Sequence, residues 1–136
     1  MSRRLRPVAA ALALLAFLPG CPQRDLPPDA AYRALARAMA ERDEDAAWAL
    51  LSTATRAKLE ERARAAATAA PGVVAPSARS VLAGDAALSV RPASAITVVE
   101  VGPDRALLRV EAPGAPPRNV TLVREDGAFR VDLPVQ

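Results

Sequence analysis

The chain of 136 residues has one strongly nucleophilic side chain, the thiol of its only cysteine, Cys21, which ends the stretch "LPGC". It contains no histidine. Ser-His-Asp and Cys-His sites need an imidazole to accept the proton of the nucleophile, and most zinc sites are built from His and Cys. The sequence therefore excludes these catalytic sites and His/Cys metal sites. A different chemistry has to explain the thiol of Cys21.

The residues before the cysteine form a short apolar segment behind a basic start. Arg3, Arg4 and Arg6 occur there without an acidic residue, and residues 8–18 are all apolar. As a helix this run would span roughly 16 Å, whereas the apolar core of a bilayer is about 30 Å thick. It is too short for a transmembrane helix and is typical of a secretory signal peptide.

The stretch "LPGC" resembles the lipobox of bacterial lipoproteins, with Leu18 at −3, the small residue Gly20 at −1 and Cys21 at +1. The resemblance implies cleavage between Gly20 and Cys21, which removes a signal peptide of residues 1–20. It also implies that the Cys21 thiol is diacylated, so that the lipid makes the membrane a partner in the cell envelope. In that family an Asp after the cysteine favours the inner membrane. Pro22 stands there instead, so we expect the outer membrane, on its periplasmic or surface face.

Two other interpretations of Cys21 remain open: a small buried apolar residue, or a cysteine that follows an ordinary signal peptide by chance. Three of the 18 Lys and Arg residues and none of the 15 acidic residues precede it, so the remaining chain carries 15 of each sign. With no basic tract and only 3% aromatic residues, we do not expect nucleic acid as a partner.

After the signal segment, the composition predicts a tether and one domain. Residues 21–28 hold the cysteine and a polar, Pro-rich tether, and residues 29–136 suit a single small domain. Apolar residues three and four positions apart predict three helices, over residues 29–43, 42–52 and 52–70.

The ends and buried sides of these helices can also be predicted. Asp43 suits the N-cap of the second helix, and Ser52 or Thr53 suits that of the third. Trp48 and Leu51 are expected on the buried side of the second helix. Residues 71–94 resist assignment, apart from a short element that packs on the helices and includes Val81, Leu82, Leu88 and Val90.

Beyond residue 94 the period of the apolar residues changes to two, which predicts strands at residues 95–101, 105–112, 118–125 and 128–133. In the second strand Ala106, Leu108 and Val110 are expected to share one face. Asp126 and Gly127 carry a hairpin signal. Helices followed by consecutive antiparallel strands predict an α+β domain, with N-terminal helices packed on a curved antiparallel sheet of about four strands.

This layout resembles a small nuclear-transport-factor-2-like domain, whose fold is a cone. The likeness covers about residues 29–133 and depends on "DEDAAWALLS" in the second helix and "VREDGAFRVDL" in the last hairpin. It implies that Trp48 and Leu51 plug the cone and that Asp126 and Gly127 form the final turn. Cone-fold enzymes of the isomerase and dehydratase type use acids and tyrosines in their pockets.

Four residues are therefore candidates for a pocket: Tyr32, Trp48, Glu100 and Glu111. The helical spacing of Tyr32 points it to the core, where packing alone would explain it. Glu100 and Glu111 interrupt apolar strands, and a solvated sheet face is the alternative explanation for both. We expect no catalytic residue, no metal and no cofactor.

Three functions are consistent with the sequence. The first is a non-catalytic, lipid-anchored envelope protein that binds a partner protein of the envelope or a small apolar ligand. The second is a small cone-fold enzyme of the isomerase or dehydratase type, which the absence of histidine disfavours. The third is a structural factor in envelope assembly that acts through an exposed sheet face.

Overall fold

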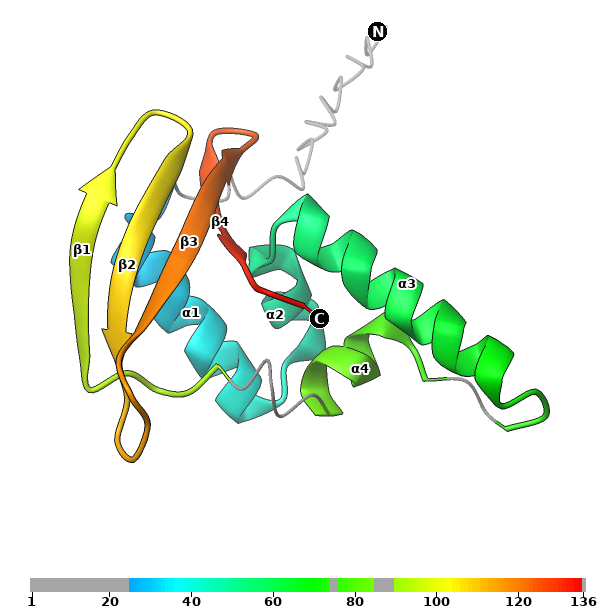
Figure 1. Cartoon of the computed structure of the whole chain (residues 1–136). Helices are drawn as coiled ribbons and strands as arrows, with labels where there is room; N and C mark the ends of the chain where they lie inside the picture. The colour runs from blue at the N-terminus through cyan, green and yellow to red at the C-terminus, as the bar shows by residue number, and fades with distance from the viewer. Residues whose placement is uncertain (1–24, 74–75, 85–89, 136) are drawn as a thin grey trace, which may run out of the picture.

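The computed structural model describes residues 25–73, 76–84 and 90–135. In this part of the chain, four helices precede four strands (Figure 1). The elements are α1 (Pro28–Glu41), α2 (Glu44–Leu50), α3 (Thr53–Ala69), α4 (Ala78–Gly84), β1 (Ala95–Val101), β2 (Arg105–Glu111), β3 (Arg118–Glu125) and β4 (Ala128–Asp132). The predicted α+β class is confirmed, and the described strands form an antiparallel sheet that does not close on itself.

The sheet is a meander in which each strand pairs with its neighbour in sequence, in the order β1-β2-β3-β4. The side chains of β2 alternate as predicted. Ala106, Leu108 and Val110 are buried, whereas Arg105 and Arg109 are exposed. Because successive side chains of a strand point to opposite faces, the helices can cover one face while the other meets solvent.

The hairpin between β3 and β4 turns at Asp126 and Gly127, as predicted. Both residues have positive φ angles, 51° and 78° respectively. Two consecutive positive φ values are the mark of a type I′ turn, whose twist matches that of the flanking strands. A side-chain carbon built on Gly127 would meet no atom within 4 Å, so glycine is favoured there by its backbone conformation and not by lack of space.

Helix α1 lies on the buried face of the sheet (Figure 1), where it contacts β1, β2 and β4. Its buried side includes Ala31, Tyr32 and Leu35. Pro28 occupies the first turn, where a missing N–H costs no hydrogen bond, and Asp29 places a negative charge at the same end. The helix therefore begins where the sequence predicts and directs Tyr32 into the core.

The junction of α2 and α3 is bonded to the outer edge of β4. The Ser52 N–H donates to the Val131 carbonyl at 2.9 Å, and Leu51 forms a parallel bridge with Val131. The Ser52 hydroxyl caps α3, since it accepts from the Thr55 N–H at 3.0 Å and donates to the Asp132 carboxylate at 2.6 Å. Of the two residues predicted as the cap of α3, Ser52 and Thr53, the structure has Ser52, and this edge of the sheet is covered.

The second helix is capped as predicted, but its tryptophan is less buried than expected. The Asp43 carboxylate accepts from the Ala46 N–H at 3.0 Å. Leu51 is fully buried, whereas Trp48 is only half-buried. Leu51 occupies the position against β4. Trp48, three residues before it, lies at the rim of the core. Leu51 is therefore part of the core, whereas Trp48, which the sequence predicts to be buried with it, packs against the core from outside.

The short element expected between residues 71 and 94 is helix α4, which packs on α3. Leu82 and Val90 belong to the buried core, and Val81 packs against it. Leu88 lies outside the described residues. Helix α3 extends past α4, and its C-terminal end projects from the body of the domain (Figure 1).

Arg124 of β3 ties together three segments at one end of the sheet. Its Nη1 donates to the Asp25 carboxylate at 2.9 Å and to the Gly127 carbonyl at 3.1 Å. Its Nε donates to the Pro103 carbonyl at 3.0 Å. The guanidinium also lies 4.2 Å from the centre of the Phe129 ring. The start of the described chain is thus held beside the β1–β2 and β3–β4 turns.

The predicted signal peptide, Gly20 and Cys21 lie outside the described residues. Within the described ranges, no helix is both long enough and apolar enough to cross a membrane.

Candidate ligand-binding site

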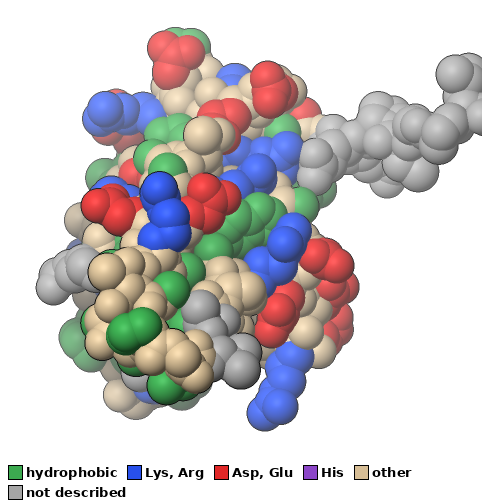
Figure 2. All heavy atoms as spheres, turned by 90° about the vertical axis from the view of Figure 1, so that its right-hand side faces the viewer, with side chains coloured by type: hydrophobic (Ala, Val, Ile, Leu, Met, Phe, Trp, Pro, Cys, Tyr) green, Lys and Arg blue, Asp and Glu red, His purple; other side chains and the backbone are tan. Residues whose placement is uncertain are grey.

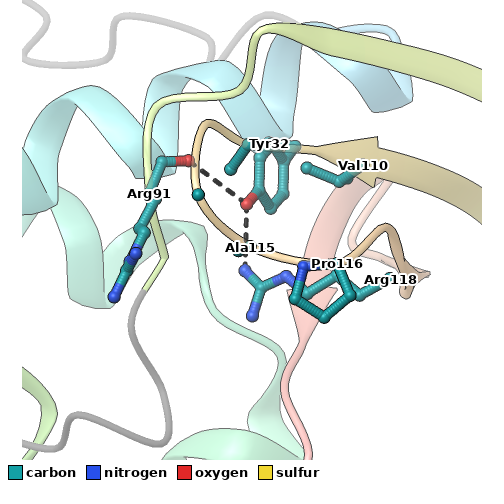
Figure 3. Close-up of a pocket in the computed structure, with 8 residues that line it drawn as sticks. Tyr32, Arg91, Val110, Ala115, Pro116 and Arg118 are labelled. Atoms are coloured by element: carbon teal, nitrogen blue, oxygen red, sulfur yellow. Dashed lines mark hydrogen bonds between the residues drawn. The ribbon is translucent and has the colours of Figure 1, made fainter.

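A cavity of about 200 Å³ opens at the end of the sheet where the loop from β2 to β3 passes the segment before β1 (Figure 3). Its lining consists of apolar side chains, a tyrosine and two arginines. These residues are Tyr32, Arg91, Val110, Ala112, Gly114, Ala115, Pro116 and Arg118. Of the four pocket candidates predicted from the sequence, only Tyr32 lies here.

Tyr32 is held rigidly, because its ring belongs to the core and only 1% of its surface is exposed. Its hydroxyl accepts a hydrogen bond from Arg118 Nη2 at 3.0 Å and donates to the Arg91 carbonyl at 3.4 Å. The second bond is long for an O–H donor, whose usual distance is about 2.7–2.8 Å. The phenolic proton is therefore only weakly engaged.

The sheet register explains why a charged residue points to the cavity. Arg118 opens β3 opposite Val110 and has the same parity as Val120 and Leu122, which are both buried. A side chain two positions before Val120 points to the same face of the sheet. Arg118 thus lies half-buried on the core side, where its guanidinium reaches the Tyr32 hydroxyl.

The loop between β2 and β3 forms one wall of the cavity. It bends at Gly114, whose φ of 73° favours glycine, and the Ala115 N–H donates to the Ala112 carbonyl at 3.2 Å. Pro116 and Pro117 follow, and their rings restrict the backbone. The wall is therefore apolar and conformationally restricted.

The charge of the cavity is one-sided. The lining contains two charged residues, Arg91 and Arg118, and no carboxylate. Within the described chain, neither Arg91 nor Arg118 forms an ion pair. In Figure 3 the guanidinium of Arg118 lies beside the Tyr32 hydroxyl, whereas Arg91 faces the hydroxyl with its carbonyl and its side chain extends away. This end of the domain therefore presents positive charge beside an apolar wall.

The two predicted carboxylates lie elsewhere. Glu111 is exposed, because Val110 before it points to the core and the next side chain of a strand must point away. Glu100 is also exposed, next to a register shift between Val98 and Glu100 in the pairing of β1 with β2. Neither glutamate lines the cavity at Tyr32.

Trp48 lies in a separate cluster of charged residues. The guanidinium carbons of Arg79 and Arg56 are 5.3 Å and 6.0 Å from the centre of its ring, close enough for cation–π contacts. Arg79 also pairs with Asp45 at 3.2 Å. Around α3 and α4 the two signs of charge intermingle about a hydrophobic patch (Figure 2). Arg79 thus has a charged partner within the protein, and Arg56 Nη2 donates to the Ala49 carbonyl at 3.1 Å.

A larger cavity of about 410 Å³ lies between α1, α2 and α4. Its charged side chains are of both signs, since Arg42, Asp43, Glu44 and Arg79 line it. Two of them have partners, because Asp43 caps α2 and Arg79 pairs with Asp45. Gly84, in its lining, is the last described residue before 85–89. The smaller cavity is the better candidate for a site, because the Arg118 guanidinium and the Tyr32 hydroxyl meet there and neither has a carboxylate partner among the described residues.

The chemistry that this cavity offers is recognition. A half-buried guanidinium and a buried phenol can bind an anion or a carbonyl oxygen through charge-assisted hydrogen bonds. The described residues contain no group of three or more His, Cys, Asp or Glu side chains arranged to hold a metal ion. The cavity lining provides no carboxylate or imidazole as a general base.

Comparison of the chain with protein-family models, curated proteins and solved structures returns no match. The function of the site must therefore be argued from its own geometry.

Sequence reasoning missed Arg91 and Arg118, although a signal for Arg118 was present. Extending the alternation of β3 backwards from Val120 assigns residue 118 to the buried face, where an arginine is unusual unless its charge has a purpose. For Arg91 the sequence holds no such signal, because it contributes through a backbone carbonyl in an irregular segment.

Proposed function

We propose that this chain is a bacterial lipoprotein, anchored through Cys21, whose domain binds a small ligand at the surface of an envelope membrane and catalyses no reaction. The membrane anchor is supported by the "LPGC" stretch behind an apolar run of signal-peptide length. The absence of Asp at position 22 supports the outer membrane as its location.

The observation that carries the ligand-binding role is the pairing of Arg118 with Tyr32 in an open cavity. Arg118 is half-buried and lacks a carboxylate partner among the described residues. Partial burial of an unpaired charge lowers the stability of a fold, because the charge loses part of its hydration. Such a residue is retained more readily when a ligand supplies the missing partner. A convergence of polar groups in an apolar-walled cavity is also the usual form of a small-molecule site.

We also propose that the domain is a variant of the nuclear-transport-factor-2-like cone. The order of helices and strands, the position of α1 on the sheet and the Asp126–Gly127 hairpin support this. The open sheet and the half-buried Trp48 depart from the expected form.

A second function is favoured by one observation on β1. Val98, Val99 and Val101 are 42%, 55% and 55% exposed, and in the described chain the outer edge of β1 has no neighbouring strand. An exposed apolar edge strand can pair with a strand of another protein. This feature supports an assembly role. The enzyme alternative has no comparable support, because Glu100 and Glu111 lie outside the cavity.

The test of the proposal is membrane fractionation of the full chain with a palmitate analogue as label. Wild-type protein should enter the membrane fraction and carry the label, because several acyl chains hold a protein stably at a bilayer. Cys21→Ala should lose both, whereas the control Pro22→Ala, which keeps the thiol, should retain both. A Cys21→Ala protein that stays in the membrane fraction, or an unlabelled wild type, would refute the anchor.

A further inference from the structure

We infer that the cavity beside Tyr32 binds a small organic monocarboxylate, with the carboxylate at Arg118 and the hydrocarbon part against the loop from β2 to β3. The inference rests on the proposed ligand-binding function and names the chemical class of the ligand. It does not depend on the lipid at Cys21.

The polar end of the ligand can be inferred from the charged side chains in the cavity lining. Arg118 places a guanidinium group at the cavity, and no acid in the lining balances its charge. A guanidinium binds a carboxylate through two parallel N–H bonds, and Arg118 Nη2 already gives one bond to a neutral oxygen, that of Tyr32. A carboxylate would compensate the charge that the phenol leaves unpaired.

Tyr32 adds a second donor for the same group. Its hydroxyl proton is directed to the Arg91 carbonyl at 3.4 Å, a long bond that costs little to exchange. By rotating about its C–O bond, the hydroxyl can donate to a carboxylate oxygen instead, while its own oxygen still accepts from Arg118. Tyr32 therefore recognises the ligand and also holds Arg118 in position.

The apolar part of the ligand can be inferred from the side chains that form the cavity walls. Val110, Ala112, Ala115 and Pro116 line the cavity with hydrocarbon, which an inorganic phosphate could not use. The volume of about 200 Å³ equals that of about six or seven water molecules in the liquid. A monocarboxylate of about four to six carbon atoms fits this size and offers both chemistries.

The test uses the single tyrosine of the chain as a reporter. Full-length protein, purified from membranes in a non-ionic detergent and carrying a carbon-13 label at tyrosine Cζ, gives one NMR signal, which comes from the cavity. Hexanoate should shift this signal in a saturable way, with a Kd on the order of 1 mM. Hexanamide, which has the same chain without the charge, and inorganic phosphate should each bind at least about tenfold more weakly.

Variants then assign the shift to the arginines. Arg118→Gln should weaken hexanoate binding about 10- to 100-fold, because it removes hydrogen bonds from a charged group. Arg91→Gln, at an exposed position that tolerates substitution, should weaken it less. The matched control is Arg109→Gln, which removes an exposed arginine of β2 outside the lining and should leave binding unchanged.

Three results would overturn the inference: no saturable shift with hexanoate, equal binding of hexanamide or phosphate, or unchanged affinity in both Arg118→Gln and Arg91→Gln with the fold intact by thermal melting. If phosphate bound more tightly than hexanoate, the ligand would be an inorganic anion and not a carboxylate. Each of these results leaves the fractionation of Cys21→Ala unaffected, so failure here is distinct from failure of the proposed anchor.

Discussion

The replacement of Ser52 by alanine tests how the helical layer is joined to the sheet. Ser52 is fully buried, and its hydroxyl lies within hydrogen-bond distance of the Thr55 N–H, the Thr55 hydroxyl and the Asp132 carboxylate. It caps α3 through the Thr55 N–H at 3.0 Å, and it donates to the Asp132 carboxylate on β4 at 2.6 Å. Asp132 also receives the Thr55 hydroxyl at 3.2 Å. The substitution thus removes the cap and the shorter of two bonds to the same carboxylate oxygen.

The magnitude follows from these two losses. Removal of a serine N-cap costs about 1 kcal/mol, and a hydrogen bond to a charged group contributes about 1.5–3 kcal/mol. Asp132 is partly exposed and keeps the bond from Thr55, so water compensates in part. We expect Ser52→Ala to lower the free energy of unfolding by about 2–4 kcal/mol, out of about 5–15 kcal/mol for a typical domain.

The assay is urea-induced unfolding followed by circular dichroism. The chain offers a matched control in Ser77, whose hydroxyl accepts from the Ser80 N–H at 3.1 Å in an exposed setting. Ser77→Ala should cost only about 0.5–1 kcal/mol, because it removes a cap and no bond to a carboxylate. If the two substitutions cost the same amount, the bond between Ser52 and Asp132 does not join helix and sheet as argued.

Three further substitutions test the remaining assignments. Trp48→Ala should lower the free energy of unfolding by about 2–3 kcal/mol in the same assay, less than the 3–5 kcal/mol of a fully buried aromatic residue. A change near zero would show that Trp48 does not pack on the core. Glu100→Gln and Glu111→Gln should each change stability by less than about 0.5 kcal/mol, as expected for exposed strand positions, and a loss above 1 kcal/mol would contradict their exposed placement.

The parts of the fold that depend on local sequence could be predicted. The caps at Asp43 and Ser52 need only a polar side chain before an apolar helix. The burial of Ala106, Leu108 and Val110 needs only the alternation of β2. The turn at Gly127 is encoded by two adjacent residues. In each case the determining contacts lie within a few positions along the chain.

The parts that depend on distant contacts could not be predicted. The extent to which Trp48 is buried depends on how Leu51 contacts β4 and on Arg79 of α4, whose guanidinium lies over the Trp48 ring. The pairing of Tyr32 with Arg118 joins residues 86 positions apart, and it requires both the placement of α1 and the register of β2 with β3. Sequence patterns give the face on which a side chain lies, but they do not say which side chain of another element meets it.

The bond from Arg124 to Asp25 sets how the domain would stand on a membrane. Asp25 follows Cys21 by four positions, so the two lie within about 14 Å of each other even if the chain between them is fully extended. A lipid on Cys21 would therefore hold the β1–β2 and β3–β4 turns close to the headgroups. Arg118 lies about 20 Å further along β3, so the cavity would open away from the bilayer. In this orientation a ligand would approach from the aqueous side and would not have to leave the lipid.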